Sequence, residues 1–122
     1  IDGCQTLGTH KFDVGTVDHA VFSGHKMYGP TGTGILYSRR PMEDLRAVRM
    51  GGGAVKHYDF SGNIDFYDGP TKHEVGTPNI AGILGLGIAA EWINFIGYDV
   101  ITSRLQDLDL AMSDADIFNI KI

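Results

Sequence analysis

The chain has 122 residues, of which 43% are hydrophobic and 20% are charged, a composition typical of a folded globular protein. Its formal net charge of −5, with no run of lysine or arginine, argues against a nucleic-acid-binding surface. No apolar stretch reaches the roughly 18 residues that a membrane-spanning helix needs, so we expect no membrane partner either.

The first residues, "IDGCQ", look like the inside of a strand, so we expect the chain to be a piece of a longer protein. Asp2 is either a turn or capping carboxylate, or a strand-end acid that holds the protonated nitrogen of a pyridoxal ring. The single cysteine, Cys4, cannot form an internal disulfide, which indicates a reducing compartment. We expect Cys4 to fill a small buried space.

Residues 17–22 predict a second short strand, and residues 34–37 predict the start of a third. Lys26 follows the second strand. A lysine in water is a poor nucleophile, because its pKa lies near 10.4, but burial or a neighbouring cation can free the amine for Schiff-base chemistry. Ser23 and His25 beside it offer a hydroxyl and an imidazole, both suited to a phosphate. Composition alone leaves open a solvated loop lysine.

Two glycine-rich stretches follow. The stretch "GPTGTG" lacks the Gly-Lys-Ser/Thr ending of a nucleotide P-loop, so we expect a tight turn with close backbone packing at Gly32 and Gly34. The triplet at 51–53 predicts either an anion-binding nest of backbone N–H groups or a flexible hinge. The histidines show no paired ligand spacing, so we expect no metal site.

The second half of the chain predicts mainly helices. "RRPMEDLRAV" has a proline and two acids that are typical of a helix start, and a long loop with short extended pieces should follow it. Residues 79–96 give the strongest helix prediction, with Asn79 as the cap and Ile83, Leu86, Ala90 and Ile93 on one face.

The glycines of this helix each cost up to about 1 kcal/mol of helix propensity, which we expect where another backbone packs against them. Residues 99–112 predict a second helix, with Ile101, Leu105, Leu108 and Met112 on one side, and "IFNIKI" at the end predicts a strand. The order of elements favours an α/β layer architecture.

Four motifs in this order, "DGCQ", "SGHKMYGPTGTGILY", "GGG" and "HEVGTPN", closely resemble those of class V aminotransferase-like enzymes that use pyridoxal 5′-phosphate (PLP). In particular they resemble the cysteine desulfurases of the SufS/CsdA type. The resemblance implies an α/β fold, the large domain of a fold type I PLP-dependent transferase, with a mixed sheet and flanking helices. Residues 1–97 would form its central part, and residues 98–122 a connecting helix and the start of the small C-terminal domain.

The resemblance also implies a role for each matching residue. Lys26 would form the Schiff base with PLP and later move protons. Asp2 would pair with the pyridine nitrogen, and Gln5 would hydrogen-bond the ring hydroxyl.

The remaining roles concern the phosphate. Ser23 and His25 would hold it, and Thr77 would reach the phosphate of the neighbouring subunit's cofactor, which requires a homodimer. The glycine triplet would lie close to the site.

The reaction implied is the removal of sulfur from L-cysteine, or selenium from selenocysteine, which leaves L-alanine. An enzyme persulfide would pass the sulfur to an acceptor protein for iron–sulfur cluster assembly in the cytoplasm. The family's persulfide-forming cysteine and its carboxylate-binding arginine have no match here, and Cys4 stands where the family usually has alanine. We therefore expect no catalysis and weak or absent PLP binding by this chain alone. Another class V PLP enzyme (a kynureninase, epimerase or aminotransferase) and a non-catalytic dimerisation module remain alternatives.

Overall fold

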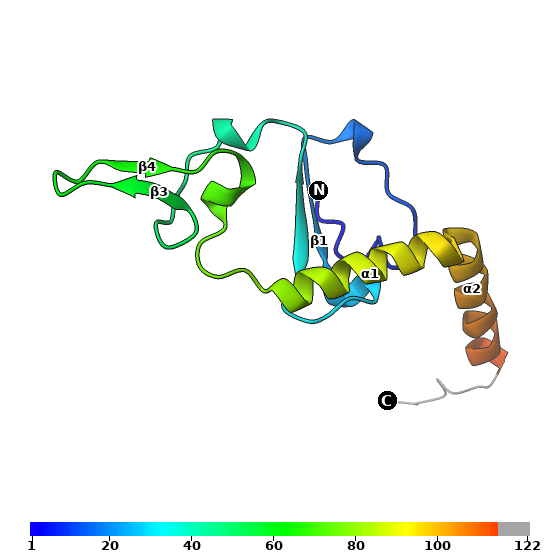
Figure 1. Ribbon diagram of the computed structural model, residues 1–122. Helices are drawn as coiled ribbons and strands as arrows, with labels where there is room; N and C mark the ends of the chain where they lie inside the picture. Colours follow the sequence, from blue (N-terminus) through cyan, green and yellow to red (C-terminus); the bar gives the residue numbers. More distant parts are fainter. Residues whose placement is uncertain (115–122) are drawn as a thin grey trace, which may run out of the picture.

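A computed structural model describes residues 1–114 (Figure 1). Strands β1 (His19–Ser23) and β2 (Gly34–Ser38) pair antiparallel, with Val21 opposite Leu36. Side chains alternate along β1, where Ala20 and Phe22 are buried, because successive residues of a strand face opposite sides of a sheet. Both strands lie where the sequence predicts them, although β1 begins two residues later than the predicted strand.

The N-terminal segment adds a short parallel edge to this pair. Asp2 forms a parallel bridge with Val21, through hydrogen bonds from Gly3 N to Val21 O (2.9 Å) and from Val21 N to Ile1 O (3.0 Å). Parallel and antiparallel pairing therefore meet on β1, which agrees with the predicted mixed sheet. The following residues form turns, and the 3-10 helix η1 (Val14–Thr16) precedes β1.

The predicted helix after Pro41 is wrong. Only one 3-10 turn forms there, η3 (Met42–Asp44), and Leu45 is already extended with φ −86° and ψ 132°. Proline and two acids provide a helix start, but the exposed Leu45 and Val48 bury no apolar face. A short helix without such packing is not stable in water.

The middle of the chain has the predicted short extended pieces. Strands β3 (Val55–Tyr58) and β4 (Ile64–Phe66) form an antiparallel hairpin with an irregularity between Val55 and His57. Asp59 closes the hairpin by accepting hydrogen bonds from the backbone N–H groups of Ser61 and Asn63, both 2.9 Å. The hairpin projects away from the helices (Figure 1), and the 3-10 helix η4 (Gly69–His73) follows it.

Both predicted helices form. Helix α1 (Ile80–Ile96) begins at Asn79, whose side-chain oxygen accepts a hydrogen bond from Gly82 N at 3.0 Å, and α2 (Tyr98–Asp114) follows directly. Neither helix is long and apolar enough by itself to cross a membrane; the two pass such a test only together, across a bend of 83°. The predicted strand "IFNIKI" lies outside the described residues.

The main hydrophobic cluster sits where three segments meet. Met27, Leu86, Ile93 and Ile101 are buried there, and they come from the turn after β1, from α1 and from α2. The N-terminal turns are attached to α2, because the Tyr98 hydroxyl donates to Leu7 O at 2.9 Å. Partial burial raises the pKa of Tyr98, which keeps this donor protonated.

The predicted apolar faces of the helices are only partly buried. Leu86 and Ile93 are buried as expected, but Ile83 is 53% exposed, and of the predicted side of α2 only Ile101 is buried. Several large apolar side chains of α1 are more than half exposed: Ile80, Ile83, Leu84, Ile88 and Phe95. Helix α1 is thus apolar on more than one side, a pattern typical of a helix that is covered from several directions.

The expected close packing against the glycines of α1 is present at two of the three. An added Cβ at Gly82 would lie 2.7 Å from Thr33 Cγ2, and one at Gly85 would lie 2.7 Å from Pro30 Cγ. A Cβ at Gly87 would meet no atom within 4 Å in the described part of the chain. The loop 30–33 therefore packs directly on the helix backbone, at the side where the lysine turn lies.

Replacing these glycines should separate packing from helix propensity. We expect Gly87→Ala to stabilise the chain by up to about 1 kcal/mol, because alanine is the better helix former. Gly85→Ala gains the same propensity but overpacks the contact with Pro30, at a cost of roughly 1–3 kcal/mol. Urea denaturation of the two variants measures the difference, and equal stabilisation by both would contradict the close packing.

Candidate active site

Lys26 lies on a turn that begins where β1 ends. The turn is the 3-10 helix η2 (Gly24–Met27), and both of its ends are tied down by backbone hydrogen bonds. Gly24 N donates to Thr33 O and Gly29 N donates to Gly24 O, each at 2.9 Å. A Cβ at Gly24 would collide with the Thr33 side chain, so glycine is needed for this approach. The predicted tight turn with close packing is confirmed, since Gly32 has φ +74° and a Cβ at Gly34 would lie 2.9 Å from Phe22 O.

The two residues after Lys26 anchor the turn on the helices. Met27 is buried in the main hydrophobic cluster. Tyr28 adopts a left-handed backbone conformation, with φ 63° and ψ 8°, which costs a residue with a side chain about 1 kcal/mol or more. Its ring packs edge-to-face on Trp92, with a centroid distance of 5.1 Å. With its neighbours anchored, Lys26 itself is exposed.

Asp2 supplies a carboxylate to the same region. Its Oδ1 accepts a hydrogen bond from Cys4 N at 2.9 Å. Hydrogen bonding by Cys4, first through its side chain and then through its backbone N–H, is the main cause that lowers the pKa of Asp2 below its ordinary value, and the positive charge of Lys26 lowers it further. The carboxylate is therefore ionised at neutral pH and lies within electrostatic reach of the lysine. The turn after Asp2 also packs on the lysine backbone, because a Cβ at Gly8 would collide with Lys26 O.

The other predicted site residues near Lys26 and Asp2 are Ser23, His25 and Gln5. Ser23 caps η2 with its backbone in an extended conformation, and its hydroxyl makes no capping hydrogen bond to the turn in the described structure. His25 is exposed directly before Lys26, and Gln5 is exposed in the turn after Asp2. An amine, an ionised carboxylate, a free hydroxyl and an imidazole thus occur together at the end of β1.

Cys4 is half-buried rather than fully buried, and its sulfur points to Val21 O at 3.9 Å. It partly fills the space beside β1, as the sequence indicates, and stays against the backbone. It also lowers the pKa of the neighbouring Asp2 carboxyl.

Thr77 lies elsewhere. It is exposed in the segment between η4 and α1, where it lines a hollow of about 250 Å³ together with Thr33 and Asn79. Lys26 does not line this hollow among the described residues. Thr33, which also lines this hollow, accepts the hydrogen bond from Gly24 N of the lysine turn.

The glycine triplet packs against the segment that carries Thr77. Gly76 N donates to Gly52 O at 2.7 Å, and a Cβ at Gly53, where φ is +87°, would lie 3.1 Å from Gly76 O. This backbone pairing limits the freedom that a hinge would need. It also links the two motifs that follow the lysine stretch in the sequence.

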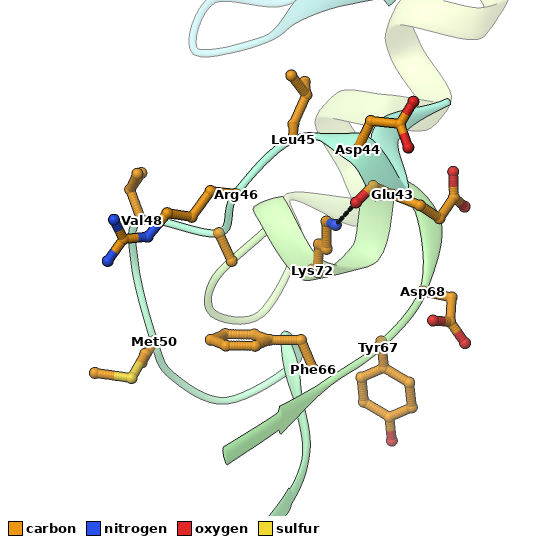
Figure 2. A pocket seen from close by; sticks show the side chains of 11 residues that line it. Glu43, Asp44, Leu45, Arg46, Val48, Met50, Phe66, Tyr67, Asp68 and Lys72 are labelled. Carbon is orange, nitrogen blue, oxygen red and sulfur yellow. Dashed lines mark hydrogen bonds between the residues drawn. The ribbon is translucent and has the colours of Figure 1, made fainter. Parts of the chain in front are cut away.

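A wide hollow of about 820 Å³ lies between η3, β4 and η4 (Figure 2). Lys72 crosses it, and its Nζ donates to the backbone oxygen of Glu43 at 2.6 Å. The other charged side chains around it carry both signs, as Figure 2 shows for Arg46 and Asp68. None of the predicted site residues lines this hollow, so its size does not make it the active site.

The sequence did not predict that Tyr28 and Trp92 pack together and anchor the lysine turn. A tyrosine before Gly-Pro carries no signal for a left-handed backbone, since glycine and asparagine are the residues expected there. Its partner Trp92 is far along the chain, so only the folded structure pairs them.

Comparison with known proteins identifies the family. The chain matches the aminotransferase class-V family over residues 1–115 and belongs to it. It is 40% identical over 111 residues to a probable cysteine desulfurase of Chlamydia trachomatis, and 38% identical over 111 residues to a cysteine desulfurase of Escherichia coli; each match covers 88% of this chain and 27% of the relative. The chain thus spans about 27% of the length of these curated relatives.

Comparison with solved structures supports the same family. The chain is similar to the apo cysteine desulfurase of Thermococcus onnurineus NA1, with a TM-score of 0.83 and 32% identity over 93% of this chain and 29% of that one. It is also similar to the cysteine desulfurase CsdA of Escherichia coli, with a TM-score of 0.77 and 37% identity over 94% of this chain and 29% of that one. The predicted family, and its α/β fold, are confirmed.

Titration of Asp2 tests the geometry of the site. We expect its folded pKa to lie below 3.8, and Lys26→Met to raise it because an attractive charge is lost. A carboxyl whose pKa is lowered on folding adds stability above its unfolded pKa, and this stability is lost as the pH falls through the folded value. Carboxyl-detected NMR measures the pKa directly.

Asp59 provides the matched control. Its pKa is also lowered, mainly by its hydrogen bonds with Asn63, but no lysine contributes. Lys26→Met should leave the titration of Asp59 unchanged. An unchanged Asp2 in this variant would show that the two side chains do not interact.

Proposed function

We propose that this chain is the central part of the large domain of a PLP-dependent cysteine desulfurase. One observation carries the proposal: an exposed lysine on an anchored turn at a strand end, beside an ionised Asp2. The names of the similar proteins support the same reaction class. Another class V PLP enzyme would share this lysine and carboxylate, so the names of the relatives favour the desulfurase among them.

The residues present fit PLP by their chemistry. Lys26 would bind the aldehyde carbon, Asp2 would face the ring nitrogen, Gln5 would bond the ring hydroxyl, and Ser23 and His25 would hold the phosphate. When bound, the cofactor withdraws electrons from the Cα of an amino-acid substrate.

The chain's own residues contribute position and proton transfer. The Asp2 carboxylate stays ionised because the side chain and the backbone N–H of Cys4 both stabilise its charge, so it would face a protonated ring nitrogen. The anchored turn limits the directions in which the Lys26 amine extends, and such orientation lowers the entropy cost of reaction. Once substrate has displaced it, the Lys26 Nζ would hold and return a proton at the substrate.

We take L-cysteine or selenocysteine as substrate and a sulfur-acceptor protein as partner. The attacking cysteine of such an enzyme needs a thiolate that reaches the substrate sulfur. Cys4 is half-buried against Val21, and no other cysteine is present in the sequence. Desulfuration therefore requires residues beyond this chain. The cytoplasmic location and the domain boundary after residue 97 stay predictions.

Trapping the cofactor on Lys26 tests the proposal. With PLP at millimolar concentration and borohydride reduction, we expect Lys26 to be labelled about tenfold more than Lys11 or Lys56, because the neighbouring groups raise the effective concentration of the ligand. Peptide mass spectrometry measures the labelling at each lysine. Asp2→Asn should reduce the preference for Lys26.

Two controls complete this experiment. Pyridoxal without phosphate should lose most of the preference if Ser23 and His25 hold the phosphate. The chain alone should release no sulfide from L-cysteine, because it has no free thiol at the site. Equal labelling of all lysines would contradict the assignment of Lys26, and rapid sulfide release would contradict the missing nucleophile.

The proposed enzyme is a homodimer. Thr77 is exposed in the segment between η4 and α1, which suits a contact with the cofactor of a second subunit. The exposed apolar side of α1, with Ile88 67% and Phe95 86% exposed, is also typical of an association surface. A dimerisation module without catalysis would use the same surface.

Sedimentation tests this surface. We expect the chain to associate in a concentration-dependent way, and Ile88→Glu with Phe95→Glu to weaken association by at least about tenfold, because charged groups would have to be desolvated. Val48→Glu, at an exposed apolar position in the segment before the glycine triplet, is the matched control. A monomeric parent chain at all concentrations would contradict the proposal.

A further inference from the structure

The backbone at Tyr28 is an exception in this chain. Tyr28 is the one non-glycine residue with a positive φ among residues 1–114. For a bulky residue this conformation is rare, and such outliers persist where the surroundings hold them in place. Tyr28 lies two residues after Lys26, at the point where the turn closes with the hydrogen bond from Gly29 N to Gly24 O.

The surroundings that hold Tyr28 belong to α1. The Tyr28 ring meets Trp92 edge-to-face, with an interplanar angle of 62°. Gly85, Ile88 and Ala89 line the same shallow apolar hollow of about 330 Å³. The aromatic contact is therefore the tertiary interaction that accompanies the unusual backbone.

The direction of Lys26 depends on this arrangement. Met27 is buried toward the main hydrophobic cluster and Tyr28 is turned onto Trp92, so two consecutive side chains after Lys26 are attached to α1. A change of residue 28 to an ordinary negative φ would redirect the chain immediately after the lysine. The turn would then lose the closure at Gly24 and the fixed origin of the lysine side chain.

We propose that Tyr28 is a positioning residue for Lys26: its contact with Trp92 holds the left-handed turn from which the lysine side chain extends. This inference rests on the proposed function for its catalytic meaning. The positioning itself is a property of the chain without any ligand. The tyrosine hydroxyl has no part in it, so the aromatic ring alone is required.

Four variants separate the ring, the backbone and general stability. Tyr28→Phe keeps the ring; Tyr28→Ala removes the ring and keeps the unfavourable φ; Tyr28→Gly removes the ring but permits the positive φ; Trp92→Leu removes the partner. Tyr58→Ala is the matched control, because Tyr58 forms a similar edge-to-face pair with Phe60 in the β3–β4 hairpin. All are compared under conditions where circular dichroism shows them folded.

The first readout is the preference of PLP for Lys26 over Lys11 and Lys56 after borohydride reduction. We expect Tyr28→Phe and Tyr58→Ala to match the parent chain, and Tyr28→Ala and Trp92→Leu to lower the preference about tenfold. Tyr28→Gly should fall between them. The second readout needs no cofactor: the Asp2 titration should shift in Tyr28→Ala in the same direction as in Lys26→Met, and not in Tyr28→Phe.

The outcomes distinguish the two proposals. If PLP shows no preference for Lys26 in the parent chain, while the Asp2 titration responds to Tyr28→Ala, the positioning stands and the proposed function fails. If Lys26 is preferred but Tyr28→Ala and Trp92→Leu change neither readout, Tyr28 has no positioning role. A loss of stability in Tyr28→Ala with both readouts unchanged would likewise overturn it, since the tyrosine would then be only structural.

Discussion

The site depends on the contact between the backbone of α1 and the loop 30–33. Pro30 and Thr33 approach the helix where Gly85 and Gly82 have no side chains. Thr33 also receives the hydrogen bond of Gly24 N, so the loop connects the helix to the turn that carries Lys26. A methyl group at either helical glycine would push this loop away. Glycine lowers the helix propensity of α1, but it allows the close approach of loop 30–33, which fixes the turn that carries Lys26.

The lysine turn combines rigid support with an open surface. Its backbone is held by Gly24, its buried side by Met27, and its end by Tyr28 on Trp92. The polar side chains themselves remain exposed, so their charges are not desolvated and the carboxylate of Asp2 ionises readily. In the proposed function, the rigid elements would provide orientation and the cofactor would provide the chemistry.

Local signals predicted much of the fold, and they failed where tertiary packing was decisive. Helix α1 formed with Asn79 as its cap because capping and apolar spacing agreed over many residues. The helix expected after Pro41 did not form, because Leu45 and Val48 found no apolar surface. The predicted side of α2 stayed exposed beyond Ile101 for the same reason. A hydrophobic pattern indicates which face can be buried, and only a packing partner buries it.

The sequence by itself determined the family to which the chain belongs, because four motifs occur in the order that the family has. Through this resemblance it also predicts Lys26, Asp2 and their neighbours as the residues of the site. Only the tertiary structure decided how the lysine is held. The left-handed backbone at Tyr28 is unfavourable in isolation, and its contact with Trp92 joins residues that are distant in the chain. Likewise, only the fold shows that Thr77 shares a hollow with Thr33, the residue that accepts the hydrogen bond from the lysine turn.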